Sequence, residues 1–140
     1  IVQTPDHVMI HAEKIHDARI IPLDGRPHTP ANIHSWLGNS RGRWDGDTLV
    51  VETKHFTRGF RGASDKLVIT ERYKRIGPNT LNYEVTIDDP KTWTRPWTFM
   101  IPLRHTDEKI YEYACHEGNS SLAGILAGAR AEERAARERK

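Results

Sequence analysis

The feature that most constrains the fold is a succession of segments in which apolar and polar side chains alternate, each followed by turn-forming residues. The clearest pair covers residues 67–73 and 81–87, which are separated by Gly77, Pro78 and Asn79. Alternation with a period of two is typical of a strand that buries one face. The sequence therefore predicts a β-hairpin here and antiparallel sheet structure for most of the chain.

Further hairpins are predicted on both sides of this pair. Residues 7–13 and 18–23, 41–44 and 48–56, and 97–103 and 109–115 form successive strand-like pairs around short turns. Residues 24–39 are rich in turn formers and predict a long irregular loop, a kind of segment that often carries function. After Ser120 and Ser121, apolar residues recur at helical spacing from Leu122 to Ala129, which predicts a helix packed by one narrow face.

These patterns predict an all-β, mainly antiparallel fold with one C-terminal α-helix. The sheet would form an up-and-down, lipocalin-like β-barrel or remain strongly curled. We expect a β-barrel domain over residues 1–121, including the irregular loop 24–39, and a C-terminal helix and charged tail over residues 122–140. A small barrel has room inside for side chains or for one small ligand.

One predicted sheet face carries an exception to its apolar character. Residues that share this face in the three clearest strands are Leu67, Ile69, Glu71 and Tyr73, then Leu81, Tyr83, Val85 and Ile87, then Trp97, Phe99, Ile101 and Leu103. Glu71 is the only carboxylate among them. A carboxylate in such a row must be ion-paired, held neutral with a raised pKa, or placed at the open end of a barrel.

The composition excludes some classes of protein. The formal net charge is only +2, with basic residues scattered among acidic ones, so we expect no nucleic-acid partner. No run approaches the roughly 20 apolar residues that span a bilayer, so we expect no membrane span. The single cysteine cannot form an internal disulfide. We expect no signal peptide in this chain, and we expect that any targeting segment has been removed.

Three motifs resemble those of a known group of proteins. They are GRWDGDTLVVET at residues 42–53, TRPW at 94–97 and YEYACHEGN at 111–119. With them the chain resembles a family of uncharacterised exported bacterial proteins. The resemblance implies a periplasmic or secreted β-barrel-like domain, and it implies no catalytic residues. The succession of hairpins also resembles lipocalin-like (calycin) barrels, in architecture only.

Aromatic residues lead to the first functional hypothesis, a cavity that binds a small aromatic or amphipathic molecule. The predicted ligand-binding residues are Trp36, Tyr73, Tyr83, Trp93, Arg95, Trp97, Phe99 and Tyr113. Glu71, Arg95 and His116 would supply polar recognition. The same aromatic side chains would equally fill a core.

The second hypothesis is an acid–base or metal-assisted enzyme that uses the same cavity. His116 and Glu117, at the end of the last predicted strand, would transfer protons together with Glu71. His28 and His34 could join His116 around a divalent metal, although no zinc signature is present and the sequence assigns no cofactor. Cys115 would point away from His116 along a strand, and it is interpreted as a packing residue.

The third hypothesis is a self-assembling structural subunit. The Arg-rich helix at residues 122–140 or an unpaired edge strand would join copies into a homo-oligomer.

Overall fold

The computed structural model describes residues 1–57, 62–112 and 120–138. The chain divides into two compact units, Ile1–Ile110 and Tyr111–Lys140. The first holds the strands β1 (Val2–Gln3), β2 (His7–His11), β3 (Ala18–Pro22), β4 (Asn39–Asp45), β5 (Thr48–Lys54), β6 (Val68–Gly77), β7 (Thr80–Asp88) and β8 (Trp97–Arg104), with a 3-10 turn at Lys14–His16. The second holds the helix α1 (Ser121–Glu138).

The larger sheet is an antiparallel meander of five strands in the order β4-β5-β6-β7-β8. Its register places Glu71 opposite Val51 on one side and Val85 on the other, and Val85 opposite Phe99. Because directly paired residues point to the same face, the alternating apolar positions of neighbouring strands form continuous rows. One face of this sheet is therefore mainly apolar, with Glu71 in its middle and a hydrogen-bonded Ser40–Thr53 pair on β4 and β5.

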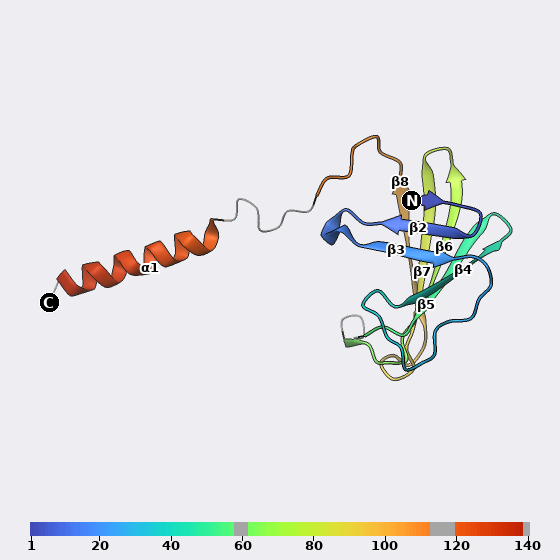
Figure 1. Cartoon of the computed structure of the whole chain (residues 1–140), viewed down its shortest axis with the longest axis horizontal. Helices are drawn as coiled ribbons and strands as arrows, with labels where there is room; N and C mark the ends of the chain where they lie inside the picture. The colour runs from blue at the N-terminus through green and yellow to red at the C-terminus, as the bar shows by residue number, and fades with distance from the viewer. Residues whose placement is uncertain (58–61, 113–119, 139–140) are drawn as a thin grey trace. The chain divides into compact units, whose positions relative to one another are not determined.

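A smaller sheet of three antiparallel strands, β1-β2-β3, crosses this apolar face (Figure 1). The two sheets approach closely at Gly42 in β4. A Cβ atom on Gly42 would lie 2.6 Å from Leu23 Cδ2 and 2.8 Å from Ile21 Cγ2, so only glycine leaves room for β3 and the residue after it. The contact fixes the distance between the sheets along one edge.

The core consists of two clusters on the apolar face. The first joins both sheets and contains Val8, Ile21, Leu49, Val51 and Tyr73. The second lies toward the other end of β6 and β7 and contains Leu67, Val85 and Ile87, with Phe56 and Trp93 packed against it. The small sheet covers the first cluster and leaves part of the face beside the second open.

The loop after β7 is held by one buried carboxylate, Asp89. Its oxygens accept hydrogen bonds from the Ser64 backbone N–H (2.5 Å), the Ser64 hydroxyl (2.6 Å), the Thr92 hydroxyl (2.6 Å) and the Lys91 N–H (3.1 Å). Burial raises the pKa of Asp89, but these hydrogen bonds outweigh it and hold the pKa below its usual range. Asp89 thus ties the segment before β6 to the loop that carries Trp93.

The structure confirms the predicted fold class: antiparallel sheets with one C-terminal helix. Within the described residues the strands do not close into a barrel, and the sheet remains open and curled. The predicted strand at residues 109–115 is wrong over 109–112, which have no strand structure. The chain leaves the sheet soon after β8, where His105 N–H still donates to the Asn79 carbonyl at 2.9 Å.

The C-terminal helix forms where the spacing predicted it. No residue of α1 is buried, and the apolar side chains of Leu122, Ile125 and Leu126 are all exposed. An apolar stripe of four residues at one end of an otherwise charged helix offers little area to bury. Within the described residues no helix is long and apolar enough to cross a bilayer.

Candidate functional site: a cavity beside a buried ion pair

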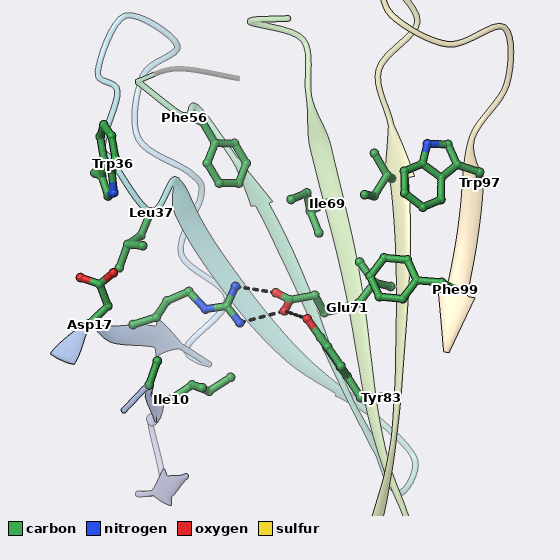
Figure 2. A pocket seen from close by; sticks show the side chains of 14 residues that line it. Ile10, Asp17, Trp36, Leu37, Phe56, Ile69, Glu71, Tyr83, Trp97 and Phe99 are labelled. Carbon is green, nitrogen blue, oxygen red and sulfur yellow. Dashed lines mark hydrogen bonds and ion pairs between the residues drawn. The ribbon is translucent and has the colours of Figure 1, made fainter. Parts of the chain in front are cut away.

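The open part of the apolar face lines a cavity of about 760 Å³. Its lining residues come from both sheets and from the loops between them: Ile10, Ala12, Asp17, Arg19, Trp36, Leu37, Phe56, Ile69, Glu71, Tyr83, Val85, Ile87, Trp97 and Phe99. Figure 2 shows Trp36 and Leu37 on one side of the cavity and Trp97 and Phe99 on the other. A groove with aromatic walls therefore remains where the small sheet ends.

The polar centre of the cavity is Glu71, whose side chain is only 3% exposed. Arg19 of β3 holds it with two parallel hydrogen bonds, Nη1 to Oε2 at 2.6 Å and Nη2 to Oε1 at 2.9 Å (dashed in Figure 2). The hydroxyls of Tyr73 and Tyr83 donate to the same Oε1, at 2.9 Å and 2.7 Å. Such bidentate pairing is the strong form of an arginine–carboxylate interaction.

The ion pair shifts the pKa values of its neighbours. Burial lowers the pKa of Arg19, but the hydrogen bonds and the charge of Glu71 outweigh burial and raise it overall. Burial first, and then the Glu71 charge, raise the pKa of Tyr83 to about 12 and raise the pKa of Tyr73 as well. The two phenol rings stack with their centroids 4.7 Å apart. All four groups thus form one hydrogen-bonded unit of a cation, a carboxylate and two neutral phenols.

The sequence reasoning recognised Glu71 as an exception and missed its partner. Arg19 lies two residues before Ile21 in a strand, so both point to the buried face. Arg19 on the core side of one predicted strand and Glu71 on the core side of another could have indicated an ion pair. Asp17, Leu37 and Phe56 were also missed, because the positions of loop residues depend on tertiary contacts.

Four of the eight predicted ligand-binding residues line this cavity. Trp36, Tyr83, Trp97 and Phe99 line it. Tyr73 lies beneath it through its bond to Glu71. Trp93 is half-buried and contacts Trp97 edge-on, with ring centroids 5.8 Å apart.

Arg95 is not among the lining residues and is exposed in the loop before β8. Tyr113, and the proposed catalytic residues His116 and Glu117, lie outside the described residues.

The loop 24–39 brings two of the candidate metal ligands, His28 and His34, close to His55. The ring centroids of His28 and His34 lie 6.1 Å and 6.3 Å from that of His55. Both nitrogens of His28 already face acceptors, Asn39 Oδ1 and Glu52 Oε1, each at 3.1 Å. Among the residues that the structure describes, no cluster of three or more His, Cys, Asp or Glu side chains could hold a metal ion.

Comparisons with protein-family models, with curated proteins and with solved structures found no match for this chain.

Proposed function

We propose that the unit Ile1–Ile110 binds a small aromatic or amphipathic molecule in the cavity between its two sheets. The observation that carries the proposal is an open cavity of about 760 Å³ that has aromatic walls and one buried polar cluster. Cavities of roughly 300–1,000 Å³ with mostly apolar walls and few polar groups are the usual form of a small-molecule site.

The exposed aromatic residues support this proposal. Trp36 is 74% exposed although it lines the cavity, and Trp97 and Phe99 are also exposed. A large apolar side chain left at the mouth of a cavity gains free energy when a ligand covers it, at about 25 cal/mol per Å² removed from water. Covering these three side chains would supply much of the affinity.

The acid–base alternative receives less support from the geometry. Glu71 Oε1 already accepts three hydrogen bonds and Oε2 accepts one, so the carboxylate is occupied by groups of the protein. A general base needs a free lone pair directed at the proton that it removes. The arrangement therefore favours a role for Glu71 in holding the two sheets together beneath the ligand.

Assembly through β8 is a weaker candidate. The hydrogen bond from His105 N–H to the Asn79 carbonyl implies that the N–H and C=O groups of odd-numbered residues in β8 point toward β7. The N–H and C=O groups of even-numbered residues therefore point to the open edge. Pro102 is one of these and has no N–H, which leaves Thr98 and Met100 as the outward donors within the strand before Arg104. Proline at such a position is typical of an edge that resists pairing. Sedimentation velocity at high protein concentration tests this, and a stable dimer would favour assembly.

We also propose that the protein is exported to the periplasm or secreted. This proposal depends only on the resemblance of the three motifs to exported bacterial proteins. Fractionation of cells that produce the full-length protein tests it, and recovery only from the cytoplasm would reject it.

The binding proposal is tested by calorimetric titration with 1-naphthylmethanol, a neutral molecule with a flat apolar ring. A ligand of this size should bind with a Kd of about 10 μM to 1 mM. Phe99→Ala should weaken binding about fivefold or more, because it removes one aromatic wall. Met100→Ala is the matched control, since Met100 is next to Phe99 in β8, points to the other face and does not line the cavity. Equal effects of the two substitutions, or no binding by the unsubstituted protein, would reject the proposal.

A further inference from the structure

We propose that the cavity selects neutral or cationic amphiphiles over anionic ones, and that Asp17 is the residue that sets this preference. The inference depends on the proposed function, because it names the class of ligand that the same cavity takes. It follows from the charges of the lining residues and from how each charge is already paired.

Three lining residues carry formal charges: Asp17, Arg19 and Glu71. Arg19 and Glu71 neutralise each other through their two short hydrogen bonds. Arg19 Nη2 also donates to the Tyr73 hydroxyl at 3.3 Å, so both terminal nitrogens of the guanidinium have partners inside the protein. The cavity therefore presents no unmatched positive charge to a carboxylate, sulfonate or phosphate.

Asp17 is different, because its negative charge is not offset. Within the described part of the chain, its carboxylate has no hydrogen-bond or ion-pair partner. Its backbone is fixed, since the Asp17 carbonyl accepts a 2.8 Å hydrogen bond from Ala12 N–H across the turn between β2 and β3. The lining thus has a net formal charge of −1, from Asp17 −1, Arg19 +1 and Glu71 −1.

The place of Asp17 in the cavity suits an amphiphile. Figure 2 shows Asp17 on the side of Trp36 and Leu37, away from Trp97 and Phe99. A ligand whose ring contacts Phe99 could extend a polar group toward this side. An ammonium group there would meet a carboxylate, and aromatic faces such as that of Trp36 attract cations as well. An anionic group there would meet the unpaired charge of Asp17.

The size of the preference follows from Coulomb's law. Two unit charges about 5 Å apart in a water-like medium interact by somewhat less than 1 kcal/mol, and a cation and an anion differ by twice that amount, which corresponds to about tenfold in Kd. Added salt should reduce the ratio, because the site is open to solvent.

Three probes that share a naphthalene ring test the inference. They are the cation 1-naphthylmethylamine, the neutral 1-naphthylmethanol and the carboxylate 1-naphthaleneacetate. The full chain is titrated at pH 8, where ordinary imidazoles are neutral. The amine should bind about tenfold more tightly than the carboxylate, and the affinity of the alcohol should lie between them. Asp17→Asn should bring the amine-to-carboxylate ratio close to one, and Asp17→Glu should keep most of it. Asp107→Asn is the control, because it changes the net charge equally at a fully exposed residue that does not line the cavity.

The outcomes separate this inference from the proposed function. If the carboxylate binds as tightly as the amine, or if Asp17→Asn leaves the ratio unchanged, the inference is wrong and cavity binding still stands. If Asp107→Asn lowers the ratio as much as Asp17→Asn does, the preference reflects the overall charge and the inference is also wrong. If none of the three probes binds, the proposed function fails and the inference fails with it.

Discussion

The buried ion pair gives the sharpest test of the structure, because its two members differ in exposure. The Glu71 side chain is 3% exposed and the Arg19 side chain is 21% exposed. Arg19→Met leaves a carboxylate buried with only two phenols, and such an uncompensated charge costs about 3–5 kcal/mol of the free energy of unfolding. Glu71→Gln should cost less, about 1–3 kcal/mol, because the amide oxygen still accepts the phenol hydrogens and Arg19 can reach water through the cavity.

The double variant tests this reasoning, because the account predicts whether its free energy of unfolding rises or falls relative to Arg19→Met. Adding Glu71→Gln to Arg19→Met removes the uncompensated charge, so the double variant should be more stable than Arg19→Met alone. Urea unfolding of the full chain, followed by its intrinsic fluorescence, measures the free energy of unfolding of the two single variants and of the double variant. Arg72→Met is the matched control, since Arg72 pairs with Asp45 at 3.0 Å on the surface and its loss should cost at most about 1 kcal/mol. A double variant less stable than Arg19→Met, or equal costs for Arg19→Met and Arg72→Met, would refute the account of the pair.

Three further predictions concern single residues. Because the pKa of Asp89 is held low in the folded state, its stabilising effect is fully present above the ordinary carboxyl pKa and is lost as pH falls from there toward the lowered folded-state pKa. Asp89→Asn should therefore flatten the loss of thermal stability between pH 5 and pH 3, and an unchanged slope would contradict this. The pKa of Tyr83 is raised to about 12, so stability is lost as pH rises from the ordinary phenol range through that value. Absorbance titration at 295 nm should show that one phenol ionises only at high pH, and Tyr83→Phe should reduce this signal. If the signal persists in that variant, it belongs to another tyrosine. Gly42→Ala should cost about 1–3 kcal/mol by overpacking between the sheets. Gly77→Ala, with no atom nearer than 4.0 Å to the added carbon, is the control in urea unfolding, and equal costs would argue against a close approach at Gly42.

The strands were predictable because each carries its own alternation and turn. Residues 68–77 and 80–88 form the hairpin that the pattern around Pro78 and Asn79 indicates. The failure at residues 109–112 has a physical reason, since alternation shows only that a segment could bury one face. Whether it pairs depends on a neighbouring strand edge, and β8 exposes an edge with Pro102 in it.

The candidate site was only partly predictable for a similar reason. The cavity-facing positions of Tyr83, Trp97 and Phe99 follow from period two within their strands. The partner of Glu71 comes from a strand 52 residues earlier in the chain, and Asp17 comes from a turn. Such long-range contacts are set by how two sheets cross, which a local pattern does not encode.

The central claim is that a small molecule binds against the apolar face between the two sheets. The most direct measurement is a set of intermolecular NOEs between 1-naphthylmethanol and the methyl groups of the protein. We expect contacts from the ring to the methyl groups of Ile10, Ile69 and Val85, which line the cavity from both sheets. Contacts confined instead to Val50 or to the exposed Leu122 and Ile125 of α1, none of which line the cavity, would contradict the account.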